Sequence, residues 1–286
     1  METFTEPAGV WTDSCLQEKP TESAMIEDVK AKVKELLESS AIDGFVGLAE
    51  RNGHVAPHLF RQPDELELLS LGDREQAGDA RYPLNKLLIN LACAYPDSTF
   101  GVLVRGCDER GLKTLYTWNQ LHRDKVVPVG IACPQDLADR CECAQPFPDN
   151  PVAGEKAKPH EFGSVDTVEE MNTPERFAYW MQEFEKCIKC YGCRDVCPMC
   201  FCKECTLEND ELVKTGTIPP ENPVFHLTRA VHMAGRCIDC GLCEEACPAD
   251  IPLRTLYKKV FEIVDEEFDY RTGFTTDRKS PLNIID

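Results

Sequence analysis

The sequence predicts an α/β N-terminal domain with a parallel sheet, followed by a mainly α-helical domain. The chain of 286 residues is long enough for two cores of ordinary size. In the first half, short apolar runs alternate with segments whose apolar residues recur at helical spacing, whereas the second half shows only segments of the latter kind. The 17 cysteines also divide unequally, with 6 before residue 150 and 11 between Cys187 and Cys247.

The first domain is expected to open with a helix and a β-hairpin. Segment Ile26–Leu37 places apolar residues at helical spacing. The next two runs, Phe45–Glu50 and His54–Leu59, flank the dipeptide Asn52-Gly53. Because both central residues of a type I′ turn need a positive φ, Asn-Gly between two such runs predicts a hairpin.

A strand, helix, strand unit is expected next. A helix at Leu84–Tyr95 leads to a strand at Thr99–Val104, a helix at Asp108–Leu121 and a second strand at Val126–Ile131. Since a helix connects the two strands, they should run parallel, with a right-handed crossover. No G-x-G-x-x-G follows a strand, so the sequence predicts no dinucleotide fingerprint.

The second domain is expected to contain helices at Glu175–Lys186, Leu227–Ala234 and Leu253–Glu267. Prolines and glycines between Gln145 and Thr173 interrupt any regular period and indicate a linker. The expected organisation is a tail at 1–24, the α/β domain at 25–150, the linker at 151–173, the helical domain at 174–268 and a tail at 269–286.

The composition excludes several classes of function. A net charge of −19 repels nucleic acid and anionic membrane surfaces. No basic segment followed by an apolar stretch opens the sequence, and no window approaches 18 uninterrupted apolar residues. We therefore expect a cytoplasmic chain without membrane insertion, whose partners are proteins or small carriers. Because thiols stay reduced in that compartment, closely spaced cysteines indicate metal or redox centres.

The second domain contains two copies of C-x2-C-x2-C-x3-C-P, 50 residues apart. Three thiolates at two-residue gaps can wrap one face of a [4Fe-4S] cubane, and in two-cluster ferredoxins the fourth cysteine ligates the other cluster. Gly192 and Gly241 are expected to provide tight backbone turns within the motifs. The expected ligands are Cys187, Cys190, Cys193 and Cys247 for cluster 1, and Cys237, Cys240, Cys243 and Cys197 for cluster 2.

Structural zinc is the alternative for these motifs, since zinc sites also use paired C-x2-C units. A zinc ion needs only four ligands, whereas the duplicated pattern supplies eight cysteines and places a proline after each copy. The pattern therefore favours two iron–sulfur clusters, which together form a dicluster ferredoxin domain.

Four cysteines of the first domain form a second candidate site. Cys107 follows one expected strand and Cys133 follows the next, so both should lie at the carboxyl edge of a parallel sheet, where open α/β sheets bind ligands. Cys141 and Cys143 come shortly afterwards and could join them. The helix that begins near Asp108 would direct its positive end toward this edge. A third [4Fe-4S] cluster and a scatter of buried thiols are the two interpretations.

The remaining five cysteines have no assigned role. Cys15 lies in the N-terminal tail and Cys93 within a helix, and neither is expected to bind a cofactor. Cys200, Cys202 and Cys205 could replace a ligand in the first domain, bind zinc with one further donor, or be structural.

Two resemblances to known families arise from these segments. The stretch "HLTRAVHMAGRCIDCGLCEEACPADIPL" resembles the α-helical ferredoxins of heterodisulfide reductase and respiratory complexes, over roughly residues 175–265. The segments "RGCDERGLKTL" and "GIACP" resemble the beta-subunit family of deazaflavin-reducing hydrogenases and formate dehydrogenases, over roughly residues 40–150.

The second resemblance implies a cofactor. In that family the domain carries FAD and passes electrons between clusters and a two-electron carrier. By resemblance, Arg105, Gly106, Cys107, Arg110 and Cys133 would lie near the flavin.

These observations lead to three hypotheses of function. The first is an iron–sulfur electron-transfer subunit of a soluble multi-subunit oxidoreductase, such as a hydrogenase, formate dehydrogenase or heterodisulfide-reductase-like complex. Its partners would be a catalytic subunit, other subunits and a soluble electron carrier. The second is a flavin-containing subunit that exchanges hydride with a deazaflavin or nicotinamide carrier. The third is an adaptor organised by zinc.

Overall fold

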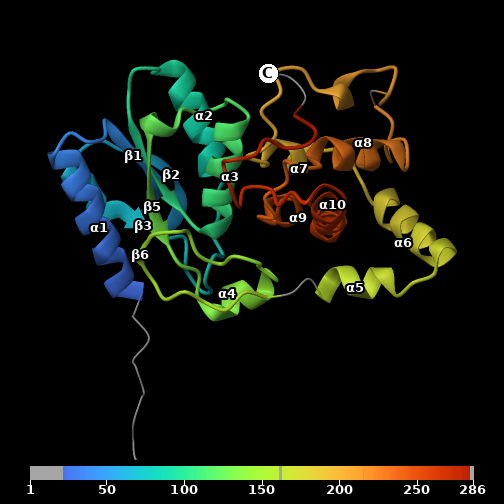
Figure 1. Ribbon diagram of the computed structural model, residues 1–286, viewed down its shortest axis with the longest axis horizontal. Helices are drawn as coiled ribbons and strands as arrows, with labels where there is room; N and C mark the ends of the chain where they lie inside the picture. The colour runs from blue at the N-terminus through green and yellow to red at the C-terminus, as the bar shows by residue number, and fades with distance from the viewer. Residues whose placement is uncertain (1–21, 161–162, 215, 284–286) are drawn as a thin grey trace, which may run out of the picture.

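The computed structural model describes residues 22–160, 163–214 and 216–283, as a sheet-based N-terminal part beside a helical C-terminal part (Figure 1). Cys15 and most of the expected tail at 1–24 lie outside the described residues. The expected fold class is confirmed, because the first part carries a mostly parallel sheet and the second is helical. No helix within the described ranges is long and apolar enough to cross a membrane.

The sheet has the strand order β2-β1-β4-β5-β6, and β3 pairs with β1 outside this path. Strands β1, β4, β5 and β6 run parallel, whereas β2 and β3 are antiparallel to β1. All five residues of β4 are buried, as expected for a central strand covered on both faces. The strands are β1 (Gly44–Arg51), β2 (His54–Phe60), β3 (Leu69–Ser70), β4 (Phe100–Val104), β5 (Val126–Ile131) and β6 (Pro151–Ala153).

Helices cover the two faces of this sheet. Helix α1 lies on one side, and α2 and α3 lie on the other, between the sheet and the C-terminal helices (Figure 1). Helix α3 follows β4 and begins two residues before Asp108, whose carboxylate accepts a hydrogen bond from the Arg105 amide. The helices of this part are α1 (Glu22–Glu38), η1 (Pro63–Leu68), α2 (Leu84–Ala94), α3 (Gly106–Thr117), η2 (Arg123–Lys125) and α4 (Gln135–Arg140).

The C-terminal part packs its longest helix, α10, against α8, α5 and α9. Two four-residue helices, α7 and α9, occupy the same place in each copy of the cysteine motif and contact each other. The elements are α5 (Gly163–Glu169), α6 (Thr173–Glu185), α7 (Gly192–Asp195), η3 (Thr206–Glu208), α8 (Val224–Met233), α9 (Leu242–Glu245) and α10 (Leu253–Phe268).

The segment expected to be an irregular linker, 151–173, contains regular structure. Pro151–Ala153 forms β6, which extends the sheet beside β5, and Gly163–Glu169 forms α5. The prolines nearby do not prevent this, because a proline is tolerated at the first residue of an edge strand. The sheet of the first domain therefore extends beyond residue 150.

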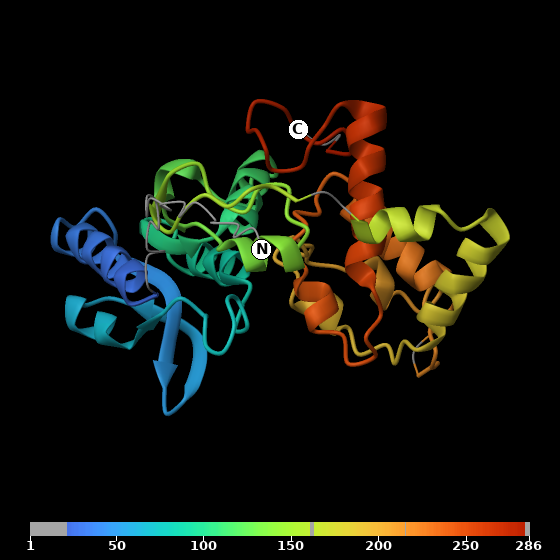
Figure 2. The ribbon, with the colours of Figure 1, turned by 90° about the horizontal axis from the view of Figure 1, so that it is seen from below.

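The C-terminal tail packs back onto the first domain, as Figure 2 shows. Tyr270 and Thr272 are buried. Gly273 lies against α3, because a Cβ built on it would come 2.3 Å from the Arg110 carbonyl oxygen. The Asn283 side chain also donates a hydrogen bond to the Thr117 carbonyl at 3.2 Å. The tail thus holds the two parts of the molecule together.

Gly273→Ala is expected to destabilise the protein more than Gly53→Ala. Both glycines have a φ of +76°, so alanine is strained at either position, at a cost of about 1–2 kcal/mol. The added methyl group meets nothing within 4 Å at Gly53, but overlaps the Arg110 backbone at Gly273. Overlap of this kind adds about 1–3 kcal/mol. Anaerobic denaturant unfolding of the two variants measures the difference, and equal midpoints would contradict the close packing of the tail.

Candidate metal centres

The four cysteines expected to ligate cluster 1 line one cavity. Cys187, Cys190 and Cys193 come from the first motif and Cys247 from the second. The wall is otherwise mostly apolar and includes Phe225, His226, Ile251 and Leu253. The fourth cysteine of the second motif therefore lies with the first three of the other motif, as the two-cluster pattern requires.

The four cysteines expected for cluster 2 line a separate cavity. Cys197 of the first motif lies with Cys237, Cys240 and Cys243 of the second. Arg229 from α8 and Tyr257 from α10 complete the wall, together with Met199 and Ile238. The exchange of the fourth cysteines is thus reciprocal, because each motif contributes one thiol to the cavity of the other.

The two motifs share their backbone geometry as well as their spacing. Lys189 and Asp239 occupy equivalent positions and both have a φ of 52°. Tyr191 and Gly241, also equivalent, have φ values of 59° and 79°. The expectation that Gly192 provides the turn in the first motif is wrong, because Tyr191 adopts the left-handed conformation and Gly192 begins α7. Gly192 instead permits close packing, since a Cβ there would lie 3.2 Å from the Ala246 carbonyl oxygen.

The four thiols singled out in the first domain also line one cavity. Cys107 lies in the first turn of α3, Cys133 follows β5, and Cys141 and Cys143 follow α4. Strands β4 and β5 are parallel neighbours, so Cys107 and Cys133 meet at the same edge of the sheet. Two backbone hydrogen bonds hold the loop after α4 beside Cys133. The Cys133 amide donates to the Pro146 carbonyl (2.8 Å), and the Cys143 amide donates to the Ala138 carbonyl (3.0 Å).

Two buried arginines direct their guanidinium groups at the thiols of this third cavity. Arg105 donates to Cys133 Sγ at 3.8 Å and pairs with Asp73 at 2.6 Å. Arg110 donates to Cys143 Sγ at 4.0 Å and to the Ile238 carbonyl at 3.0 Å. Such cations favour deprotonated thiolates and an anionic cluster beside them.

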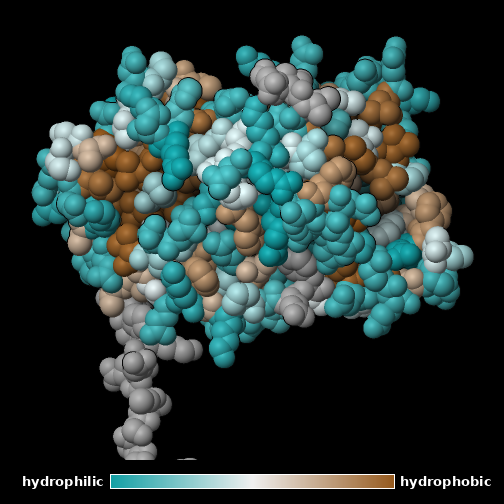
Figure 3. All heavy atoms as spheres, viewed as in Figure 1, coloured by the Kyte–Doolittle hydropathy of each residue, from teal (hydrophilic) through white to brown (hydrophobic). Residues whose placement is uncertain are grey.

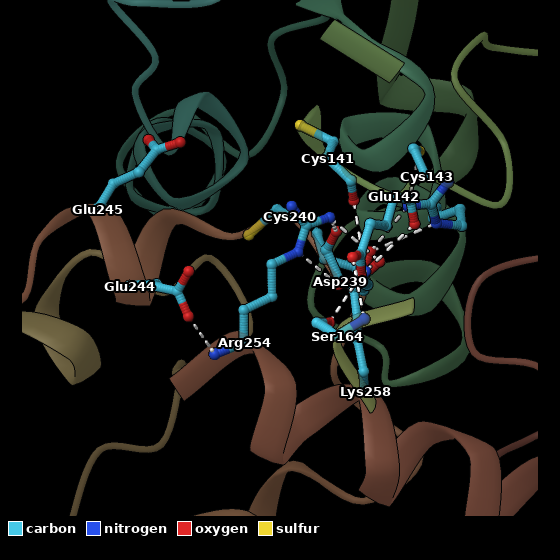
Figure 4. A network of polar contacts seen from close by, with 12 residues as sticks. Cys141, Glu142, Cys143, Ser164, Asp239, Cys240, Glu244, Glu245, Arg254 and Lys258 are labelled. Atoms are coloured by element: carbon cyan, nitrogen blue, oxygen red, sulfur yellow. Dashed lines mark hydrogen bonds and ion pairs between the residues drawn. The ribbon is translucent and has the colours of Figure 1, made fainter. Parts of the chain in front are cut away.

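The second and third cavities share a wall. Asp239, Cys240 and Arg254 line both of them. Arg254 Nε donates to Asp239 Oδ1 at 2.7 Å, and the Arg254 side chain lines the same cavity as Cys141. Figure 4 shows Arg254 extending from the helical part toward Asp239. Part of the contact between the two parts of the chain is therefore made beside the thiols.

A second ion pair closes the same contact from α10. Lys258, only 2% exposed, lies 2.7 Å from Glu142, which is placed between Cys141 and Cys143 (Figure 4). Glu142 also accepts a hydrogen bond from the Ser164 hydroxyl at 2.6 Å. Burial alone would raise the pKa of Glu142, but these interactions outweigh it and lower the pKa of this carboxyl group. They hold the loop of Cys141 and Cys143 against the helical part.

Buried donors without a partner point to missing acceptors in all three cavities. His226, which lines the first cavity, has no partner at either ring nitrogen. Arg229 Nε and the Tyr257 hydroxyl in the second cavity are also unpartnered, as is Arg81 Nε in the third. An orphaned buried donor is costly, and a cluster with inorganic sulfides would supply acceptors for each of them.

The pKa values of the thiols are consistent with metal binding. Burial raises the pKa of Cys107, Cys133, Cys240 and Cys243, and that of Cys237 to about 12. Buried thiols of this kind keep their protons unless a metal replaces them. Burial also lowers the pKa of His226 to about 4, so its imidazole is neutral and has one N–H to donate.

The arrangement suits a cluster better than a single ion. Among the residues that the structure describes, no three His, Cys, Asp or Glu side chains lie close enough together to hold one metal ion. The thiols of each set surround a cavity instead of converging on a point, whereas a zinc ion needs four donors at about 2.0–2.3 Å.

The residues that the resemblance places near a flavin make close contacts with protein groups. Arg105 and Arg110 are buried and donate to protein carbonyls and thiols. A Cβ on Gly106 would come 2.2 Å from the Gln145 carbonyl oxygen, so protein already fills the space beside it.

Several residues of these cavities carry no signal in the sequence. Arg81, Arg229 and Arg254 lie outside the cysteine motifs and reach the thiols only through the tertiary fold. Their position before or within a helix is ordinary for an arginine, so spacing alone could not have identified them.

Comparison with known proteins defines the class of the helical part. The family described as "4Fe-4S dicluster domain" matches residues 186–252. That range contains all eight cysteines of the first two cavities. The chain thus carries a 4Fe-4S dicluster domain, and the expectation of iron–sulfur clusters in this part is confirmed.

The chain is also similar to beta subunits of formate dehydrogenases, which confirms the resemblance found in the sequence. It is 42% identical over 105 residues to the F420-dependent formate dehydrogenase subunit beta of Methanocaldococcus jannaschii, covering 37% of this chain and 28% of the relative. It is 50% identical over 94 residues to the F420-dependent formate dehydrogenase 1 subunit beta of Methanococcus maripaludis, covering 33% and 24%. The matched part thus spans about a quarter of these relatives.

Proposed function

We propose that the chain is the iron–sulfur electron-transfer subunit of a multi-subunit oxidoreductase related to formate dehydrogenases and hydrogenases. It relays electrons between a catalytic subunit and a carrier. The similarity to formate dehydrogenase beta subunits and the dicluster domain support this function. The clusters move one electron at a time, and the protein supplies their spacing, orientation and electrostatic environment.

The observation that carries the proposal is the connection between the three thiol cavities. The third cavity adjoins the second through Asp239, Cys240 and Arg254, and the second is tied to the first by the exchange of Cys197 and Cys247. Three [4Fe-4S] clusters in these cavities form a continuous path from the sheet edge to the far end of the helical part. The ligand sets are those named above for cluster 1, cluster 2 and the third set of the first domain.

The outer face of α8 is a candidate surface for a partner subunit. Val224, Leu227 and Val231 are 40%, 46% and 65% exposed there, and Figure 3 shows hydrophobic side chains gathered over this helix. The opposite face of the same helix carries His226, at the first cavity, and Arg229, at the second. A partner bound to α8 would therefore be separated from two clusters by a single helix. We place this assembly in the cytoplasm, as the sequence predicts.

The full chain, purified without oxygen, is expected to bind iron and sulfide and to take up electrons stepwise from a reductant. Cys133→Ala should lower the count by about four irons and one electron. Because the third cavity adjoins the second, their reduced clusters should also split each other's electron paramagnetic resonance signals. This splitting should disappear in Cys133→Ala and persist in Cys190→Ala, which acts on the first cavity.

Cys93→Ala is the control, since Cys93 is exposed on α2 and lines none of the three cavities. An iron-free but folded chain that contains zinc would contradict electron transfer and favour the adaptor hypothesis. Acid extraction of the same preparation tests the flavin hypothesis, because a yellow chromophore released in equal amount to protein would show that the chain binds the cofactor that hydride exchange requires.

A further inference from the structure

Three cysteines outside the three cavities line a fourth, larger one. Cys200, Cys202 and Cys205 follow the first motif and border a cavity of about 350 Å³. All three are free thiols, and Cys202 is exposed. The segment between α7 and η3 that carries them is short, so the three thiols are held near one another by the chain itself.

Arginines lie around these thiols. Arg229 Nη1 donates to Cys200 Sγ at 3.1 Å, and both terminal nitrogens of Arg236 lie 3.7 Å from Cys202 Sγ. Arg194 lines the same cavity as Cys205. The arginines come from α7, α8 and the turn after α8, so three separate segments direct positive charge at three successive cysteines.

The arginine beside Cys202 is fixed in place and has one donor without an acceptor. The Arg236 guanidinium lies over the rings of Phe201 (4.2 Å) and Trp118 (4.7 Å). Its Nε is buried and has no hydrogen-bond partner. A rigid cation with a spare donor at a thiol-lined cavity indicates an anionic occupant that accepts hydrogen bonds.

We propose that Cys200, Cys202 and Cys205 hold a fourth [4Fe-4S] cluster in this cavity, with a fourth ligand that is not cysteine. The three cysteines come from one short segment with the spacing C-x-C-x2-C, one residue shorter than in the two motifs, and three thiolates close together can ligate three irons of a cubane. A carboxylate or imidazole of the same wall, from Glu204, Glu208 or His232, is available for the remaining iron. The guanidinium groups then donate to the sulfurs and offset the negative charge of the cluster.

The size of this cavity favours a cluster over a zinc ion. Within the described residues the donors do not converge on a single ion, and they surround a cavity far larger than one ion. The position of the cavity also fits a redox role. Arg229 and Met233 line both it and the second cavity, and Cys200 lies within hydrogen-bond distance of Cys197. This inference rests on the proposed function, because the fourth cluster would exchange electrons with the path formed by the other three.

The test is the metal content of the full chain after anaerobic reconstitution with iron and sulfide. Wild type is expected to bind about sixteen irons, four for each of four cubanes. Cys202→Ala/Cys205→Ala should lose about four irons and one electron equivalent. Cys93→Ala, the matched exposed cysteine outside every cavity described here, should lose none.

Wild type with about twelve irons, unchanged in the double variant, would overturn the fourth cluster and leave the three-cluster path intact. One zinc per chain that is lost in the double variant would also overturn it. If the double variant does not fold, the wild-type count is compared with that of Cys133→Ala, because about twelve irons that fall to about eight in Cys133→Ala would leave none for a fourth cluster. Failure of the proposed function would give a different result. Wild type would then lack the irons whose binding depends on Cys133, Cys190 and Cys240.

Discussion

Cys197→Ser is expected to remove the cluster of Cys237, Cys240 and Cys243, and to leave the cluster of the motif in which Cys197 itself lies. The reason is the reciprocal exchange, in which Cys197 lines the second cavity and Cys247 lines the first. The loss should be about four irons, together with the signal of one cluster in anaerobic electron paramagnetic resonance spectra.

Pairs of substitutions make this test decisive. Cys197→Ser combined with Cys240→Ser should lose no more iron than either alone, about four, because both act on one cluster. Cys197→Ser combined with Cys190→Ser should lose about eight, because two clusters are affected. The opposite pattern would show that each motif ligates its own cluster.

Removal of iron is expected to unfold the helical part while the sheet of the first part persists. Helices α7 and α9 have only four residues each, and isolated helices of that length are not stable in water. Eight cysteines of the helical part face the first two cavities, so the clusters occupy the place of a larger apolar core. In such domains the free energy of metal binding is also free energy of folding.

The measurement is hydrogen exchange with and without an iron chelator under anaerobic conditions. Amides of α7, α8, α9 and α10 should lose protection, whereas those of β1, β4 and β5 should keep it. Their protection rests on a buried apolar cluster that includes Val46, Val102 and Val129. An iron-free chain that protects α7 to α10 as well as the loaded chain does would refute this expectation.

Local patterns in the sequence predicted which cysteines line the same cavity, because these groups follow from spacing and strand topology. Parallel strands end at one edge, and this alone places Cys107 and Cys133 together. The motif spacing likewise led to the two exchanged sets. Both arguments need only short stretches of chain, which is why they agree with the geometry of the folded protein.

The parts that could not be predicted depend on contacts between distant segments. Arg254 reaches Cys141 from α10, and Arg110 reaches the Ile238 carbonyl from α3, although no local pattern marks either residue. Strand β6 has three residues and forms only because β5 offers a free edge. The buried tail around Gly273 is polar and turn-rich, and its burial depends on the surface of α3.

The wall shared by the second and third cavities also constrains how the protein matures. On the ribosome, Cys107, Cys133, Cys141 and Cys143 emerge well before Asp239, Cys240 and Arg254, which close the same cavity. Until that later segment is made, the third cavity lacks the wall that these three residues form. A cluster bound there, as proposed above, would be enclosed by both parts of the chain, so we expect it to be inserted before the helical part docks.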